Sequence, residues 1–271
     1  MIENMDNNLQ EQDPMAQKLS DLKEESLKQE KQVKEKIPVI KCRIKFAKYG
    51  VMKFIGHLDI MRFFQKVFRR SGIDIAYTEG FSPHQVMSFA SPLAVGVCSN
   101  GEYLDVSLYS ATTSQDMIDR MNAQSVEGIR ILSFQQLPEK AEKAMSAVAA
   151  ASYTVAFRED VKVRIPDLSK VVCDFYAQDS IIIEKQGKKT VSQLDLKEHI
   201  HELYEKDGSV YMLIDTGSVT HIKPMVIMEQ LLTFAGITEK PEELFTVTRE
   251  DTYLKQDDQL YPMNAFCTDF T

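Results

Sequence analysis

Residues 52–92, MKFIGHLDIMRFFQKVFRRSGIDIAYTEGFSPHQVMSFASP, hold the helix, loop and strand pattern on which the fold prediction rests. Five apolar residues recur at helical spacing: Leu58, Met61, Phe64, Val67 and Phe68. This spacing predicts an amphipathic helix. Gly72 supplies a C-terminal stop, and Arg69 and Arg70 suit the negative end of the helix dipole. The segment therefore predicts a helix that ends at Gly72.

Strand-like segments surround this helix. The apolar and polar alternation over residues 41–46 predicts a strand with Cys42, Ile44 and Phe46 on one face. Tyr49-Gly50 is typical of a turn, and a short extended piece is expected at 51–55. Further strands are predicted at 75–78, 86–89, 102–108 and 129–134, with a helix capped by Thr or Ser at 114–123.

The resulting order is strand, helix, strand, strand, helix, strand. Ferredoxin-like (split β-α-β) domains have this order, and two helices cover one face of their antiparallel sheet. A second copy is predicted from strands at 151–157, 180–184, 209–214 and 244–249 and helices at 167–176 and 225–234. Residues 190–206 fit either extended chain or a short helix. The predicted fold class is α+β, with two tandem ferredoxin-like domains preceded by a disordered polar tail.

The chain divides into five predicted parts. Between Gln17 and Lys36 the apolar residues are Leu19, Leu22, Leu27 and Val33. So little apolar surface does not offset the entropy of ordering, which predicts a disordered or nascent-helical tail. The predicted parts are the tail at 1–38, a first ferredoxin-like domain at 39–137, a linker at 138–150, a second domain at 151–255 and a C-terminal tail at 256–271.

Charge is distributed unevenly along the chain. The net charge is -8, yet residues 41–72 carry nine cations and one acid, Asp59. Local field rather than total charge governs the binding of a polyanion, so one preferred basic face is expected. No stretch approaches twenty apolar residues, and the N-terminus lacks the basic start and apolar middle of a signal peptide. We expect a cytoplasmic protein without membrane contact.

The loop Gly80-Phe81-Ser82-Pro83-His84 joins two predicted strands. Glycine permits an unusual backbone conformation and proline rigidifies the turn. One interpretation is a tight loop whose Phe81 plugs the core. The other is a loop that stacks Phe81 on a base or ligand while His84 contacts a phosphate or a hydroxyl.

The predicted helix carries four cations close to i, i+4, i+7 and i+8: Arg62, Lys66, Arg69 and Arg70. A solvated helix face commonly explains such a run, but a run without interleaved glutamate also indicates phosphate binding. The candidate residues for RNA or partner binding are Arg43, Lys45, Lys53, Arg62, Lys66, Arg69, Arg70, Tyr77, Phe81 and His84.

His57 and His84 are weak candidates for catalysis. His57 can simply cap the helix that follows it, or it can lie with His84 at a helix N-terminus, a natural anion site. Two histidines can cleave RNA by general acid and base catalysis if they face each other. Because no complete catalytic motif accompanies them, a binding role is favoured over an enzyme.

Neither a metal nor a cofactor is expected. Cys42, Cys98, Cys173 and Cys267 lie more than fifty residues apart, which favours buried, reduced thiols over metal ligands. His199 and His201 form an H-x-H pair without a third ligand in register, so a surface cluster is favoured. The common nucleotide, hydrolase and metalloprotease motifs are not present in the sequence.

Several motifs resemble a bacterial family. They are Arg43-Ile-Lys-Phe, Phe54-Ile-Gly-His-Leu-Asp, Phe68-Arg-Arg-Ser-Gly-Ile, Ala76-Tyr-Thr-Glu-Gly-Phe-Ser-Pro-His, Leu93-Ala-Val-Gly-Val and Glu102-Tyr-Leu-Asp-Val. The chain resembles the radical-SAM-linked proteins, also called the domain of unknown function 2344, from about Lys41 to Tyr253. The shared motif positions are His57, Asp59, Arg69, Arg70, Tyr77, Gly80, Phe81, Pro83 and His84.

The resemblance implies a role beside a radical-SAM enzyme in RNA modification or in ribosome and RNA maturation. The sequence has no C-x-x-x-C-x-x-C motif, so the cluster would belong to a separately encoded partner. The leading hypothesis is therefore an RNA-binding or substrate-presenting accessory protein. The alternatives are an RNA endonuclease or modifying enzyme that uses His57 and His84, and a protein-binding adaptor without RNA contact.

Overall fold

A computed structural model describes residues 39–186, 191–218 and 220–271. The predicted polar tail, residues 1–38, lies outside these described residues. Val39–Thr271 form one compact unit.

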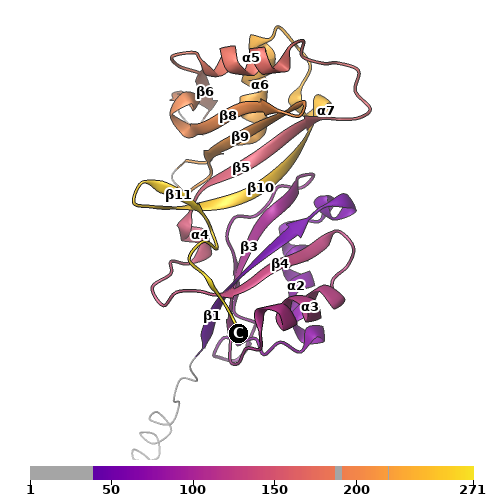
Figure 1. Cartoon of the computed structure of the whole chain (residues 1–271), viewed down its shortest axis with the longest axis vertical. Helices are drawn as coiled ribbons and strands as arrows, with labels where there is room; N and C mark the ends of the chain where they lie inside the picture. Colours follow the sequence, from indigo (N-terminus) through magenta and orange to yellow (C-terminus); the bar gives the residue numbers. More distant parts are fainter. Residues whose placement is uncertain (1–38, 187–190, 219) are drawn as a thin grey trace, which may run out of the picture. The chain divides into compact units, whose positions relative to one another are not determined.

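The N-terminal half of this unit follows the predicted element order (Figure 1). Its elements are β1 (Ile40–Lys48), the 3-10 helix η1 (Gly50–Phe54), α2 (His57–Ser71), β2 (Met87–Phe89), β3 (Cys98–Leu108), α3 (Ser114–Ala123) and β4 (Ile129–Gln136). β1 pairs with β3 and β4, and β2 pairs with β3, all antiparallel. Two details of the prediction are wrong. The segment predicted as extended at 51–55 falls mostly in η1, and 75–78 forms isolated bridges at Ile75 and Tyr77.

The C-terminal half repeats the order with one insertion. Its elements are α4 (Ala144–Ala147), β5 (Val148–Phe157), α5 (Leu168–Tyr176), β6 (Ile182–Gln186), β7 (Val191–Asp195), the 3-10 helix η2 (Leu196–His199), β8 (Ile200–Lys206), β9 (Ser209–Asp215), α6 (Pro224–Phe234), α7 (Pro241–Leu244) and β10 (Phe245–Gln256). β6 and β7 form a separate two-stranded sheet, and the other strands lie in the order β10-β5-β9-β8. The ambiguous segment 190–206 therefore holds a strand, a 3-10 helix and a second strand.

The two halves share one sheet. Thr248 and Arg249 on β10 pair in parallel with Cys98 and Ser99 on β3, at the seam between the halves. The resulting ten-stranded sheet runs β12-β4-β1-β3-β10-β5-β9-β8, with β2 and β11 at its side. The predicted linker at 138–150 contains α4 and the first residues of β5. The protein is thus a mixed α+β fold built on one large, mostly antiparallel sheet.

Helix α2 packs its apolar stripe on the first half of the sheet. Phe64 is fully buried, and its ring meets the ring of Phe46 at 4.8 Å between centroids, in an edge-to-face arrangement. Gly72 ends the helix in the left-handed conformation, with φ of 63°, as predicted. The prediction that Leu58 lies on the buried stripe is wrong, because its side chain is 62% exposed and Ile60 is buried instead.

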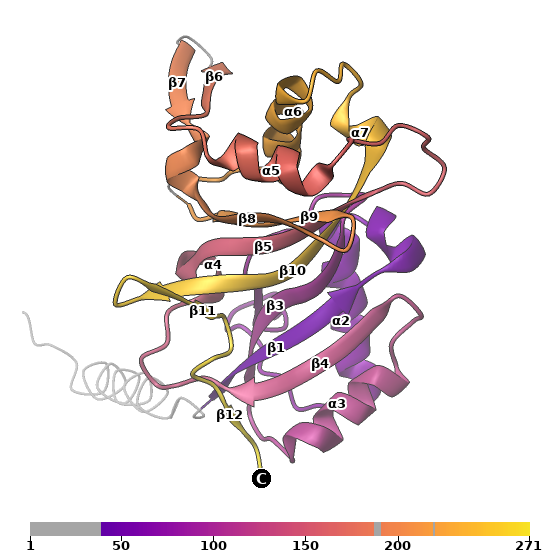
Figure 2. The same cartoon turned by 45° about the horizontal axis from the view of Figure 1, so that its top comes forward.

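The face of the sheet opposite α2 and α3 is crossed by the C-terminal segment (Figure 2). This segment forms β11 (Gln259–Pro262) and β12 (Thr268–Asp269), and β12 pairs with β4. The Asn264 amide donates to Gln135 Oε1 at 3.0 Å, and Asn264 Oδ1 accepts a hydrogen bond from the Tyr103 hydroxyl at 3.1 Å. The predicted C-terminal tail therefore belongs to the folded unit.

Candidate functional site

The cations predicted on α2 are exposed in the structure. Arg62, Lys66, Arg69 and Arg70 all face solvent. Arg62 forms an exposed ion pair with Asp59, 3.3 Å long, which contributes little to stability. Within the described residues the other three side chains have no ion-pair partner. Their charges are available to a ligand.

The loop Gly80–His84 presents an aromatic side chain to solvent. Gly80 has φ of 112°, a conformation that side-chain-bearing residues rarely adopt. Thr78 fixes the far end of the loop, because its Oγ1 accepts from the His84 amide at 3.1 Å and its amide donates to the His84 carbonyl at 2.8 Å. Phe81 is fully exposed. The interpretation that Phe81 plugs the core is therefore wrong.

Gln85 ties the loop to the helix. Its side chain is buried, and Nε2 donates to the Gln65 carbonyl of α2 at 3.4 Å. His84 precedes Gln85 in the chain, and the exposed Tyr77 lies opposite Gln85, because these two residues form an isolated β-bridge. We call Arg62, Lys66, Arg69, Arg70, Phe81 and His84 the α2–loop surface. It combines four cations with one exposed ring.

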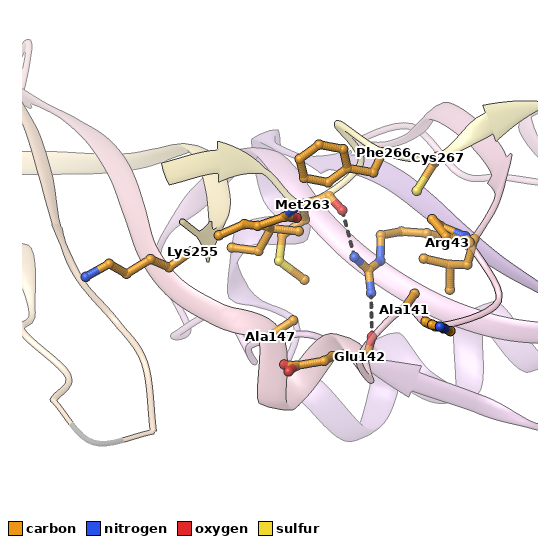
Figure 3. Close-up of a pocket in the computed structure, with 13 residues that line it drawn as sticks. Arg43, Ala141, Glu142, Ala147, Lys255, Met263, Phe266 and Cys267 are labelled. Atoms are coloured by element: carbon orange, nitrogen blue, oxygen red, sulfur yellow. Dashed lines mark hydrogen bonds between the residues drawn. The ribbon is translucent and has the colours of Figure 1, made fainter. Parts of the chain in front are cut away.

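Arg43 does not belong to this surface, contrary to the sequence prediction. It is 2% exposed, and its Nε and Nη2 bind the two carboxylate oxygens of Asp105 at 2.7 and 2.9 Å. Nη1 donates to the Met263 carbonyl at 2.7 Å, and Nη2 lies 3.4 Å from the Glu142 carbonyl (Figure 3). Arg43 also lines a cavity of about 360 Å³, together with Met263, Phe266 and Cys267 of the C-terminal segment.

Lys45 and Lys53 are also less available than predicted. Lys45 Nζ forms a 2.7 Å ion pair with Asp251 and is only 20% exposed. Lys53 is half-buried and lies over the ring of Phe54. The sequence shows charge but not contacts, so it could not separate these partly buried cations from the exposed ones on α2.

The two candidate catalytic histidines line different places. His57 begins α2 and borders a small hollow with Lys48, Glu102 and Phe89. His84 is the last residue of the exposed loop, and its neighbour Gln85 contacts Gln65, which lies eight residues after His57 on α2. At 1.5 Å per residue this corresponds to about 12 Å along the helix axis. Among the described residues, the hollow that His57 lines does not include His84.

Sequence reasoning missed a buried group of charges at the seam. Lys48, Glu102 and Arg249 are 2%, 5% and 4% exposed, and Arg249 Nη1 lies 3.1 Å from Glu102 Oε1. The strand alternation contained a signal, because Lys48 continues the inward positions of Ile44 and Phe46. A charged side chain at an inward position of a strand normally needs a partner of opposite charge, so Lys48 could have been recognised as a candidate for a buried ion pair.

The thiols and remaining histidines show no assembled metal site. The part of the chain that the structure describes contains no group of three His, Cys, Asp or Glu that could hold a metal ion. Burial raises the pKa of the Cys42 thiol to about 12, while Cys173 is exposed, so the prediction of buried thiols fails there. His199 and His201 both contact Asp215, at 2.9 and 2.7 Å.

The fold and this surface define a mixed α+β protein that carries an exposed basic helix beside an aromatic loop. A family model described as "Uncharacterized protein conserved in bacteria (DUF2344)" matches residues 41–224, and the chain belongs to this family. None of the helices in the described residues is both long and apolar enough to cross a bilayer.

Two further comparisons add little. A search of curated proteins found no match. A solved structure titled "Crystal Structure of a Cbf5-Nop10-Gar1 Complex" contains a similar chain, with 13% identity and a TM-score of 0.40. The match covers 78% of this chain and 48% of that chain, so this chain spans about half the length of the solved one. A likeness of this size assigns neither fold nor activity.

Proposed function

We propose that the protein is an RNA-binding or substrate-presenting accessory protein that binds single-stranded or looped RNA at the α2–loop surface. Sequence-specific recognition of RNA usually targets unpaired bases, which stack on aromatic side chains while cations bind the phosphates. The observation that carries the proposal is the fully exposed Phe81 on a loop that Gln85 holds against the basic helix. A solvated helix alone would not need an aromatic ring presented beside it.

The proposal includes a fold relationship and a partner. Each half has the strand order of a ferredoxin-like repeat, β4-β1-β3 with β2 beside β3, and β10-β5-β9-β8. We take the halves as two such repeats fused through β3 and β10. The partner is a separately encoded radical-SAM protein, acting in RNA modification or maturation. This part rests on the motif resemblance alone.

The experiment is a filter-binding titration with unstructured RNA. Arg69→Glu with Arg70→Glu reverses two cations of the α2–loop surface and is expected to weaken binding by at least tenfold. Lys162→Glu with Lys170→Glu makes the same charge change on exposed residues elsewhere and is the matched control. Equal loss in both variants, or no RNA affinity in the unaltered protein, overturns the proposal. If another protein still co-purifies with this one after nuclease treatment, the adaptor alternative is favoured.

A further inference from the structure

The seam between the halves contains more buried positive than negative charge. Lys48 ends β1, Glu102 lies on β3 and Arg249 lies on β10. Arg249 pairs with Glu102 and also donates to the Ser91 carbonyl at 3.1 Å. Arg249 Nε has no hydrogen-bond partner within the described residues. One carboxylate therefore faces two buried cations.

Lys48 carries the surplus charge. An ammonium has three donors, yet the hydrogen bond that Lys48 Nζ makes within the described residues is a long one, 3.5 Å, to the Ile55 carbonyl. Burial lowers the pKa of Lys48, and the nearby Arg249 acts in the same direction against the opposing effect of Glu102. Buried charges are normally paired, so the cluster lacks one anion.

A hollow lies where that anion would sit. Lys48, His57 and Glu102 line it together with Phe46, Phe89, Pro92 and other apolar residues. Its volume is about 20 Å³, which is enough for one water-sized group. The His57 ring meets the Phe89 ring edge-on at 5.0 Å and forms part of the wall.

Helix α2 begins at the same hollow. Its N-cap is Gly56, which has no side-chain cap, and the carbonyl that Lys48 contacts belongs to the residue just before it. The first N–H groups of a helix point outward without intrahelical partners and attract anions. Asp59 in the same turn is 63% exposed and paired with Arg62. It does not neutralise Lys48 in the interior.

We propose that this hollow is an oxyanion-binding subsite, in which Lys48 and the first turn of α2 bind one oxygen of a phosphate group and His57 contacts the rest. The volume admits the leading oxygen, and the remaining oxygens stay at the rim. The phosphate can be a free inorganic ion or a phosphodiester of RNA. This inference is independent of the α2–loop surface, which has its own cations.

The test follows thermal unfolding of the full chain during a titration with inorganic phosphate, with sodium chloride at matched ionic strength as reference. The unaltered protein is expected to show a saturable rise in Tm. Lys48→Met is expected to lose that rise, and Lys170→Met, which removes an exposed cation on α5, is expected to keep it. No saturable rise in the unaltered protein, an equal rise in Lys48→Met, or a rise caused equally by chloride overturns the inference.

A second variant covers the case in which Lys48→Met does not fold. His57→Gln keeps a polar group at the rim and is expected to weaken phosphate binding by about tenfold; unchanged binding contradicts the inference. A short RNA added to the Arg69→Glu and Arg70→Glu variant separates the two sources. If the RNA displaces inorganic phosphate from the hollow, the ligand of the hollow is a phosphodiester. If inorganic phosphate stays bound, the ligand is the free ion. The phosphate titration stands whether or not the α2–loop surface binds RNA.

Discussion

Arg249 on β10 and Glu102 on β3 form a 3.1 Å ion pair in the protein interior, where both side chains are about 5% exposed. The pair crosses the seam at which the two halves of the sheet meet. Removing one partner of a buried pair is costly because the other charge stays buried without compensation. We therefore expect this pair to couple the folding of the two halves.

Glu102→Leu should destabilise the protein by about 3–5 kcal/mol, since it leaves two buried cations without a carboxylate. The double variant Glu102→Leu with Arg249→Met also removes the cation that paired with Glu102 and should recover part of that loss, while Lys48 stays buried without a carboxylate. Urea unfolding measures both free energies. A loss below 1 kcal/mol in the single variant would show that the seam is hydrated or movable.

Gly101→Ala should destabilise the fold by about 2–3 kcal/mol, because overpacking at fixed backbone atoms forces shifts. A Cβ at Gly101 would lie 2.6 Å from the Cα of Asp251 on β10. Gly56→Ala is the matched control, because a Cβ there meets nothing within 4 Å and its φ is -72°. Thermal or urea unfolding compares them, and equal effects would contradict the close approach of β3 and β10.

Alkaline pH should lower the free energy of unfolding through the buried thiol of Cys42. Burial raises the pKa of Cys42 from 9.0 to about 12, so the folded protein holds this proton while the unfolded chain releases it. The contribution is fully present below pH 9 and is lost as the pH rises toward 12. Between pH 9 and 10.5, Cys42→Ala should show a shallower decline in unfolding free energy than the unaltered protein. Exposed Cys173→Ala should leave the decline unchanged.

Phe81→Ala should weaken RNA binding by about tenfold, in line with about 1–3 kcal/mol for one base stacked on an aromatic ring. It should leave Tm unchanged because the ring is fully exposed. Phe64→Ala provides the contrast: it empties part of the core and should cost about 3–5 kcal/mol of stability. Filter binding and thermal unfolding give both quantities. A large fall in Tm for Phe81→Ala would mean that the ring packs in the folded state.

Local patterns in the sequence predicted much of the fold. Helix α3 has the predicted bounds, and Thr113 caps it by accepting from the Asp116 amide. Caps and apolar spacing act within a few residues, so a single sequence reveals them. The pairing of β3 with β10 joins segments about 150 positions apart, and no local pattern encodes it.

The sequence predicted the exposure of a candidate side chain where that exposure follows from the residue's position on a helix. It did not predict exposure where segments distant in the sequence cover the side chain. The cations of α2 lie on its solvent side, as their spacing predicts. Arg43 lies on the face of β1 that points away from α2. The segment that buries its side chain contains Met263, which lies 220 positions later in the chain. The charge at Lys48 was visible in the sequence. Its hollow, however, also depends on residues from other parts of the chain, which are Ile55, His57, Ile60, Phe89, Pro92, Leu93 and Glu102.

The central claim is that cations on α2 bind RNA phosphates. The measurement that tests it most directly is the salt dependence of RNA affinity, because each phosphate contact on a single strand contributes about -0.7 to the slope of log affinity against log salt concentration. The unaltered protein should show a slope of about -2 to -3, and Arg69→Glu with Arg70→Glu should reduce its magnitude by about 1.4 or more. A slope near zero, or one that the double reversal leaves unchanged, would contradict the account.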